Sequence, residues 1–265
     1  MPLVCVTGDV HHDLGIFEDT IQMLKVGHMR SELRNSEYLC ASEYSEIAED
    51  YATKITLFVT GKCLEKHESF WESLSCKQHV ELGGHIYAVM PIHFHMLFKK
   101  FFNSHYGPYF YQEMDIKKSL QAFNRIGVRP KSWRTHGYWG NETTYKILGK
   151  YGFKVVSDFV NIGDLQVNKV NGTGDLKHIP INTLPDDKIW DFYLKKNPQK
   201  IKKVGEKIRE SISDGVKKKR DLVIQLHPIC QKLLDNYETF KVILKQLSEN
   251  NYSSLTITEL ADNFL

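Results

Sequence analysis

The sequence predicts an α/β fold: an irregular (β/α) barrel of about seven strands that forms a single domain over residues 1–265. Short β-rich runs alternate with longer stretches of helical periodicity along the chain, which is typical of a largely parallel sheet joined by crossover helices. No Ser- or Pro-rich linker and no shift in composition divides the chain. These observations favour one barrel-like domain over two smaller ones.

Eight short runs rich in apolar and β-branched residues are the expected strands. In chain order they span residues 3–7, 54–60, 80–82, 132–135, 153–160, 178–181, 222–226 and 254–257. Six amphipathic stretches are long enough to be the crossover helices. They span residues 16–29, 43–51, 115–126, 141–151, 198–214 and 235–250.

Two segments interrupt this alternation. Residues 93–112 are dense in aromatic side chains and end in the turn-like Tyr106-Gly107-Pro108, so we expect an insertion folded over one face of the domain. Residues 161–174 are rich in Gly and Asn and are expected to form a long loop.

Composition excludes several classes of protein and partner. The 35 Lys and Arg residues nearly balance the 32 Asp and Glu residues, and a formal charge of +3 is too small to indicate a nucleic-acid or anionic-membrane partner. The five Cys residues have no Cys-x-x-Cys spacing, which argues against a disulfide framework and favours the reducing cytoplasm. The early polar residues and the lack of an apolar run of ~20 residues predict neither a signal peptide nor a membrane span.

Reactive side chains of α/β barrels collect where strands end and loops begin, so the polar residues there form the candidate site. A histidine count of twelve is also the one composition value out of line with an ordinary globular chain. A buried histidine that is hydrogen-bonded to the backbone would explain any one of these polar residues. It does not explain well why such residues occur at five strand ends. The residues at these five ends are Asp9, His11, His12 and Asp13 after the first run, His85 after the third, Arg134 and His136 after the fourth, Asp158 within the fifth and His227 after the seventh.

These residue types point to a metal site. Imidazole and carboxylate groups bind zinc and related divalent metals where thiolates are absent, and a catalytic site uses three protein ligands and leaves one position for water. Such a metal lowers the pKa of water from about 16 toward ~7, while a nearby carboxylate can accept the proton. We therefore expect a divalent metal as cofactor, with zinc as the first choice.

The order of the motifs resembles that of the polysaccharide deacetylases of the NodB-homology type, carbohydrate esterase family four. The similar segments are Asp9-Val10-His11, residues 54–61 (KITLFVTG), 80–87 (VELGGHIY), 133–138 (WRTHGY), 141–158 (NETTYKILGKYGFKVVSD) and Leu226-His227. The resemblance covers roughly residues 3–260. It implies an irregular (β/α) barrel and a metal-dependent enzyme that removes acyl groups from N-acetylated sugars and related amides.

Two positions depart from the family pattern. His11 stands where the family has a metal-binding Asp, and Val89 stands where it usually has a second metal-binding His four residues after His85. Three alternatives follow. In the first, Asp9 is the base and His11 and His85 bind the metal, with a third ligand from His12, Asp13, His93 or His95. In the second, Asp9 itself coordinates the metal. In the third, no metal binds and catalysis is lost.

The resemblance also implies roles around Asp9. Arg134 would pair with this base and keep it ionised, since an opposite charge within ~4 to 6 Å lowers a carboxylate pKa. Backbone N–H groups near Gly137 and Tyr138 would stabilise the tetrahedral oxyanion together with the metal. Tyr138 and Trp139 could also stack on a sugar ring, although aromatic residues at a barrel mouth are as often packing.

His227 would protonate the leaving amine, and Asp158 would orient one of the cationic groups. His136 replaces a Pro of the family and takes no role from it. The expected function is therefore a metal-dependent hydrolase that deacetylates an N-acetylated amino sugar or glycan. Its expected metal ligands are His11, His85 and His12.

Two other functions are alternatives. Gly8-Asp9-Val10-His11 also resembles the Asp-x-His opening of metallophosphoesterases, and Gly83-Gly84-His85 and His93-Phe94-His95 loosely match their later motifs. The middle motif Gly-Asp-x-x-Asp is missing between His12 and His85, which makes this function the weaker one. The other alternative is a non-catalytic, carbohydrate-binding relative that keeps the barrel and has lost its metal.

Overall fold

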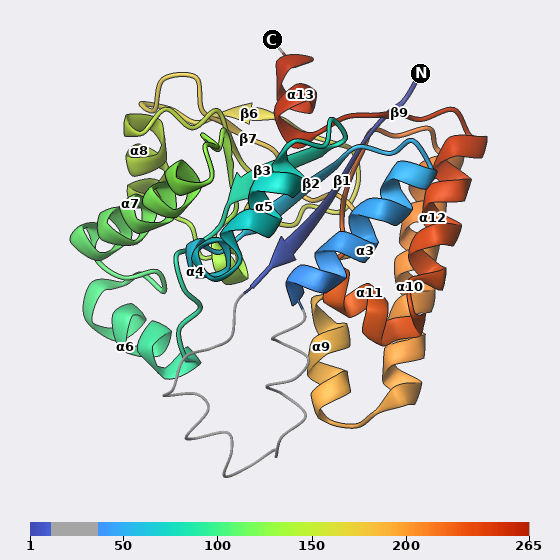
Figure 1. Cartoon of the computed structure of the whole chain (residues 1–265), viewed down its shortest axis with the longest axis horizontal. Coiled ribbons are helices and arrows are strands. Elements are labelled where there is room, and N and C mark those ends of the chain that lie inside the picture. Colours follow the sequence, from blue (N-terminus) through green and yellow to red (C-terminus); the bar gives the residue numbers. More distant parts are fainter. Residues whose placement is uncertain (12–36, 265) are drawn as a thin grey trace.

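The computed structural model describes residues 1–11 and 37–264, and a curled sheet runs through the centre of the molecule (Figure 1). The sheet of the described residues has nine strands, eight of them in the order β6-β7-β5-β4-β3-β2-β1-β8, with β9 paired to β1. All these pairings are parallel except that of β6 with β7. The predicted α/β fold with an irregular, barrel-like sheet is confirmed.

The longest strands are neighbours in the sheet and set the position of the site. They are β1 (Leu3–Val10), β2 (Ile55–Val59), β3 (Val80–Gly84) and β8 (Leu222–Gln225). Nearly all their residues are buried, because helices cover the faces of a parallel sheet, and most of the buried side chains are apolar. Val59 pairs with both Val10 and Gly84, so these three strands end at one level.

The remaining strands are only two residues long, and all but β6 are shorter than the runs that predicted them. They are β4 (Ser132–Trp133), β5 (Val155–Val156), β6 (Asn168–Lys169), β7 (Lys177–His178) and β9 (Ser253–Ser254). Strand β6 lies inside the segment expected to be a loop. Backbone bonding continues past β4, since the N–H of Arg134 donates to the carbonyl of Gly84 at 2.9 Å. This bond positions Arg134 at the edge of the sheet where β1 and β3 end.

Helices cover the sheet, as Figure 1 shows. Their bounds are α3 (Glu37–Asp50), α4 (Gly61–Lys66), α5 (Glu68–Ser75), α6 (Ile92–Phe102), α7 (Tyr109–Arg125), α8 (Glu142–Lys150), α9 (Asp187–Leu194), α10 (Pro198–Lys217), α11 (Pro228–Asp235), α12 (Glu238–Glu249) and α13 (Ile257–Asp262). The helices predicted at 43–51, 115–126, 141–151 and 198–214 correspond to α3, α7, α8 and α10. The helix expected at 16–29 lies outside the described residues.

The stretch 235–250 forms the end of α11 and then α12. The two helices are separate because Asn236 and Tyr237 take left-handed backbone angles, with φ of 53° and 69°. Such angles cannot continue a right-handed helix. Apolar periodicity does not reveal this break, since both helices bury apolar residues against the same core.

The largest apolar cluster packs α3, α10, α11 and α12 against the central strands. Figure 1 shows these four helices together at one side of the sheet. The ring of Tyr44 in α3 stacks on that of Phe240 in α12, with centroids 3.9 Å apart. Both rings are fully buried. Burial of about 150–250 Å² per aromatic ring is a large part of what holds this helical layer on the sheet.

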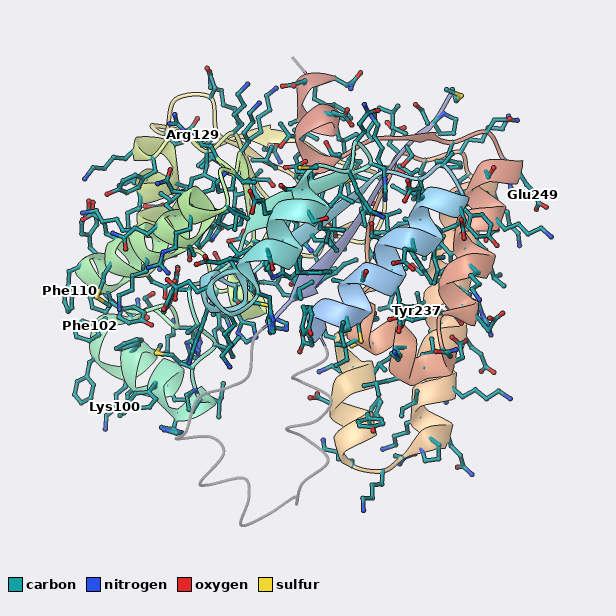
Figure 2. All side chains as sticks on the ribbon, viewed as in Figure 1. Lys100, Phe102, Phe110, Arg129, Tyr237 and Glu249 are labelled. Carbon is teal, nitrogen blue, oxygen red and sulfur yellow. The ribbon has the colours of Figure 1, made fainter. Side chains whose placement is uncertain are left out.

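The aromatic segment 93–112 contains α6, a turn and the start of α7. Figure 2 places Lys100, Phe102 and Phe110 at the outer edge of these two helices. Phe102 and Phe110 are exposed, whereas His95 on the inner side of α6 is buried. In the part of the chain that the structure describes, no helix is both long and apolar enough to cross a bilayer.

Candidate active site

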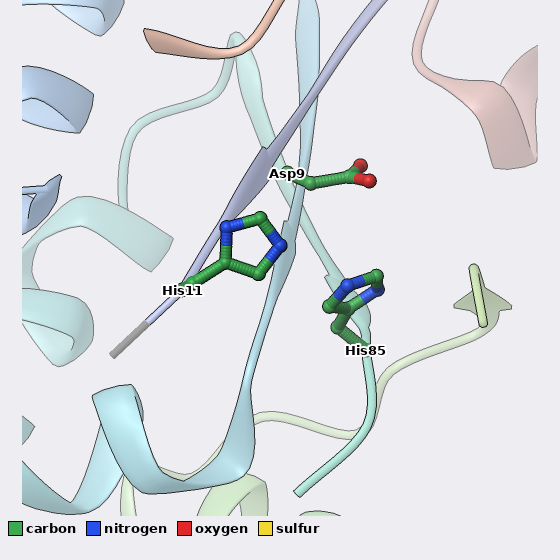
Figure 3. Close-up of side chains that lie close together, drawn as sticks. All are labelled: Asp9, His11 and His85. Carbon is green, nitrogen blue, oxygen red and sulfur yellow. The ribbon is translucent and has the colours of Figure 1, made fainter. Parts of the chain in front are cut away.

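Polar side chains from four strand ends meet at the carboxyl edge of the sheet. Asp9 lies at the end of β1, and His85 directly follows β3. Arg134 follows β4, and His227 follows β8. His11 follows β1 directly, and Figure 3 shows its ring close to the ring of His85 and to the carboxylate of Asp9. The carboxyl ends of parallel strands lie at one edge of a sheet, which is why residues so distant in sequence converge here.

A buried ion pair joins Asp9 and Arg134. Nη1 of Arg134 donates to Oδ1 of Asp9 at 2.8 Å, and Arg134 is fully buried. Its remaining donors bond Thr7 Oγ1 at 3.0 Å and both the carbonyl and the hydroxyl of Ser157 at 2.7 and 3.1 Å. Burial acts to raise the pKa of Asp9, but the charge of Arg134 and the interactions with the nearby histidines together outweigh it and hold that pKa well below the ordinary value. Asp9 is therefore an ionised carboxylate at neutral pH.

The second oxygen of Asp9 faces the end of β8. Nε2 of Gln225 donates to Oδ2 of Asp9 at 3.2 Å. Nε2 of His227 lies 3.7 Å from the same oxygen. Both carboxylate oxygens are thus engaged by side chains of other strands.

His11 and His85 each use one ring nitrogen for support and leave the other free for a ligand. Nδ1 of His85 lies 2.5 Å from the carbonyl oxygen of Arg134, and this acceptor fixes the proton on Nδ1. Nδ1 of His11 lies 3.4 Å from Oε2 of Glu37, which also accepts the backbone N–H of His11 at 2.7 Å. Such outer contacts are typical of metal-binding histidines.

The opposite nitrogens, Nε2 of His11 and Nε2 of His85, are buried and have no hydrogen-bond partner among the described residues. One donor atom from each of Asp9, His11 and His85 lies within 4.8 Å of the other two. Burial lowers the pKa of His85 to about 3, so its imidazole is neutral, which is the form that binds metal. Two imidazole nitrogens without partners beside a carboxylate fit a divalent metal.

His227 is paired with a carboxylate that sequence reasoning missed. Nδ1 of His227 lies 2.5 Å from Oδ1 of Asp186, which is fully buried. Oδ2 of Asp186 accepts the backbone N–H of His227 at 2.9 Å and Nε2 of Gln231 at 2.7 Å. Burial acts to lower the pKa of His227, but the charge and hydrogen bond of Asp186, together with the charges of Asp9 and Asp187, outweigh it and raise that pKa to about 10. His227 is thus held as a cation with Nε2 directed at Asp9.

Asp158 lies elsewhere at the same edge. Its Oδ1 accepts the Tyr145 hydroxyl at 3.1 Å and lies 2.8 Å from Nε2 of His178. In the described chain, no hydrogen bond or ion pair joins Asp158 to Arg134 or His227. The structure therefore places Asp158 beside His178, a residue to which the sequence assigned no function.

Gly137 and Tyr138 form a turn between β4 and α8. The 3-10 helix His136–Tyr138 contains Gly137 at φ 63° and Tyr138 at φ 60°, angles that favour glycine at the first position. The N–H of Tyr138 already donates to the carbonyl of Thr135 at 3.0 Å. The Tyr138 hydroxyl bonds Gln225 and Oδ2 of Asp187, the latter at 3.1 Å.

His136, the residue without an expected role, lies within the cluster. Its ring centroid is 5.2 Å from that of His11 and 5.6 Å from that of His85. Burial, then the nearby imidazoles, hold the pKa of His136 well below its ordinary value.

The other candidate ligands do not join this cluster in the described structure. His12 and Asp13 lie outside the described residues. His93 and His95 are on α6, where Nδ1 of His95 lies 2.8 Å from the carbonyl of His105 and its ring packs on Trp139. The grouping of donor atoms around Asp9 contains neither of them.

Sequence reasoning also missed Glu37 and Gln225. Asp186-Asp187 was the one available signal for the His227 partner, because the two adjacent acidic residues are the N-cap and first residue of a helix. No expected strand ended just before Asp186, so this residue was not among the candidates at strand ends. Glu37 and Gln225 carry no signal, since each acts through a contact with a residue more than twenty positions away.

No family model matches the sequence, and no curated protein matches it. Solved structures do match over nearly the whole chain. A protein from Mycobacterium smegmatis assigned to the polysaccharide deacetylases is 14% identical with a TM-score of 0.72, covering 99% of this chain and 90% of its own. An allantoinase is 12% identical with a TM-score of 0.71, covering 99% of this chain and 89% of its own. A pseudoenzyme of the CE4 family from Bacillus anthracis is 13% identical with a TM-score of 0.58, covering 98% of this chain and 66% of its own.

Fold and site together define a barrel-like α/β protein with a histidine-rich polar cluster at the carboxyl edge of its sheet. The fold is that of the polysaccharide deacetylases of the NodB-homology type, as the motif order predicted. These similarities are to the fold alone, and the same fold occurs here in structures named as a deacetylase, an allantoinase and a pseudoenzyme. Function must therefore be argued from the site.

Proposed function

We propose that this protein is a metal-dependent hydrolase that removes the acetyl group from an N-acetylated amino sugar or glycan, an amidohydrolase acting on linear amide C–N bonds. The observation that carries the proposal is the pair of buried, unpartnered Nε2 atoms of His11 and His85 beside the ionised carboxylate of Asp9. The NodB-type fold and the order of its motifs support it.

His11 and His85 would hold the metal, for which zinc is the expected ion, and His12 follows directly in the chain as a further donor. A bound divalent metal polarises the substrate carbonyl and lowers the pKa of water toward ~7. Glu37 and the carbonyl of Arg134 keep the two imidazoles in the tautomer with Nε2 free.

Asp9 would take the proton of the attacking water. Arg134 keeps it ionised, and the same charge makes it a weak base. A weak base is effective only toward water that is itself unusually acidic, which is what a metal supplies. The low pKa of Asp9 thus favours a metal-assisted reaction over direct base catalysis.

His227 would give a proton to the leaving amine. Asp186 orients its Nδ1 and keeps the ring cationic, so a proton is available at Nε2. That nitrogen lies 3.7 Å from Asp9 and 3.8 Å from Asp187. Base and acid therefore lie side by side, where both could reach the same scissile amide.

Three further residues complete the proposal. Gly137 would supply a backbone N–H to the oxyanion, because the N–H of Tyr138 is already used within its turn. Tyr138 would instead line the substrate space with its ring. Asp158 would act as a positioning residue through His178 and Tyr145. The expected partner is the acetylated carbohydrate, with neither nucleic acid nor membrane, and the expected compartment is the cytoplasm.

Acetate release from N-acetylhexosamine oligomers tests this proposal. Wild-type protein loaded with zinc should release acetate, a chelator should abolish the release, and added zinc should restore it. Asp9→Asn should lower kcat by at least about 100-fold, the low end for loss of a general base. Asp191→Asn is the matched control, because Asp191 is a half-exposed carboxylate whose partner is the exposed Lys188. Equal activity of Asp9→Asn and wild type would refute the assignment of the base.

Two further measurements, compared with acetate release, separate the two alternative functions. Hydrolysis of an aryl phosphate ester without acetate release would indicate a phosphoesterase. Glycan binding by a protein that takes up no zinc, cobalt or nickel would indicate a non-catalytic relative. Either result would overturn the deacetylase proposal.

A further inference from the structure

His136 stands where a third metal ligand is needed. This inference rests on the proposed function, which requires a metal at His11 and His85. A catalytic zinc site uses three protein ligands, and the two histidines provide two. Val89, four residues after His85, cannot be the third, since its side chain is apolar and packs on the cluster around Trp133.

The three imidazole rings of His11, His85 and His136 are close neighbours of one another. Their centroids are 5.3, 5.2 and 5.6 Å apart, so they form a nearly equilateral triangle. Nitrogen ligands at about 2.1 Å put each ring centre about 3.2 Å from a metal, and tetrahedral angles then separate the ring centres by about 5.2 Å. The observed separations match this value within a few tenths of an ångström.

A buried nitrogen without a partner marks each of the three rings. Nδ1 of His136, like Nε2 of His11 and Nε2 of His85, has no hydrogen-bond partner among the described residues. A buried polar atom without a partner costs about 1–3 kcal/mol, so three of them together need an explanation. One ion bound by all three would satisfy them at once.

A nitrogen of His136 would join the donor atoms of His11 and His85 only after its ring turns. The donor atoms that already lie within 4.8 Å of one another are those of Asp9, His11 and His85. Rotation of the His136 ring about its Cβ–Cγ bond changes which atom faces the other imidazoles and leaves the ring in nearly the same place. The backbone at this turn is held by the Tyr138 N–H bond to Thr135 and by Gly137 at φ 63°.

Asp9 is less suited to be the third ligand. Its Oδ1 accepts a charge-assisted bond from Arg134 at 2.8 Å, and its Oδ2 accepts from Gln225 at 3.2 Å with His227 also facing it. A carboxylate so engaged is already neutralised by a buried cation, which weakens its attraction for a metal. The same contacts leave it well placed to accept a proton.

We propose that His136 is the third protein ligand, so that the metal is bound by three imidazoles, His11, His85 and His136, while Asp9 remains outside the coordination sphere as the base.

Metal binding by matched variants tests this proposal. Zinc affinity would be measured by competition with a chromophoric chelator, and the ligand field by the visible absorption of the cobalt-loaded protein. We expect His136→Gln to weaken zinc binding by more than about 100-fold, beyond the 10–100-fold typical of outer-shell changes, and to alter the cobalt spectrum. We expect Asp9→Asn to keep the wild-type affinity within about 10-fold, as an outer-shell change would. His105→Gln is the control, because its ring stacks on Trp139 without joining the triangle.

The possible results are distinct. Loss of zinc binding in Asp9→Asn with wild-type binding in His136→Gln would overturn this inference and assign Asp9 as the ligand. His136→Asp, which restores a donor atom, should recover part of the affinity; if it binds no better than His136→Gln, a direct ligand role is refuted. Far-UV circular dichroism shows whether each variant is folded. Wild-type protein that binds no divalent metal would instead refute the proposed function itself.

Discussion

Replacing Asp186 by Asn isolates the charge that keeps His227 protonated. In the wild type, Oδ1 of Asp186 lies 2.5 Å from Nδ1 of His227. Asn keeps the size of the side chain and an oxygen that can accept from Nδ1, but it removes the negative charge. Asp186 is fully buried and His227 is 7% exposed, so water cannot compensate for the loss. We expect the pKa of His227 to fall from about 10 toward or below its ordinary 6.5.

The cost in stability follows from the same contact. Removing one partner of a buried ion pair costs about 3–5 kcal/mol, and because Asn keeps an acceptor we expect the lower end, about 3 kcal/mol near neutral pH. The folded-state pKa of His227 is raised, so this stabilisation is fully present below about pH 6.5 and is lost as pH rises through about 10. The difference between wild type and variant should therefore be largest near pH 6 and shrink toward pH 10.

Urea unfolding followed by circular dichroism at about pH 6, 8 and 10 measures this difference. Asp191→Asn is again the control, and its unfolding free energy should stay within about 0.5 kcal/mol of wild type at each pH. The alkaline limb of kcat/KM for acetate release should move to lower pH in Asp186→Asn, since the acid form of His227 is lost earlier. A stability difference that stays constant or grows toward pH 10 would refute the reasoning.

Two further changes probe the contacts behind the site. Glu37→Gln removes the charge beside Nδ1 of His11, and we expect zinc affinity to fall by about 10–100-fold in a competition titration; unchanged affinity would show that Glu37 does not support the ligand. Arg134→Met leaves the Asp9 carboxylate buried without its cation, and we expect the free energy of unfolding to fall by about 3–5 kcal/mol. A loss below about 1 kcal/mol in urea unfolding would contradict the view that this pair is desolvated.

The strand-end argument located the centre of the site because of a property of parallel sheets. Asp9, His85, Arg134 and His227 each follow an apolar run in the sequence, and the structure brings all four to one edge. The argument needs only the order of strands and loops, which apolar periodicity records. Their chemical roles remain predictions that the experiments above decide.

Contacts that depend on tertiary packing do not follow from the order of strands and loops. Asp158 lies within a predicted strand, and the structure places it beside His178 and Tyr145, because β5 is separated from β1 by three strands of the sheet. Asp186 follows no predicted strand, yet it is the partner of His227. Which residues each of these two aspartates contacts depends on the position of the strands within the sheet, and the sequence does not display that position.

The sequence by itself determined the α/β class, the order of the motifs and the residue types available to a metal, because burial periodicity and side-chain chemistry are local properties of the chain. Only the tertiary structure decided which of those residues meet. It placed His136, a residue with no expected role, beside His11 and His85, and it placed His95 in a separate contact with His105 and Trp139. The physical reason is that a ligand set depends on distances of a few ångströms, which the packing of helices on the sheet fixes and local periodicity does not encode.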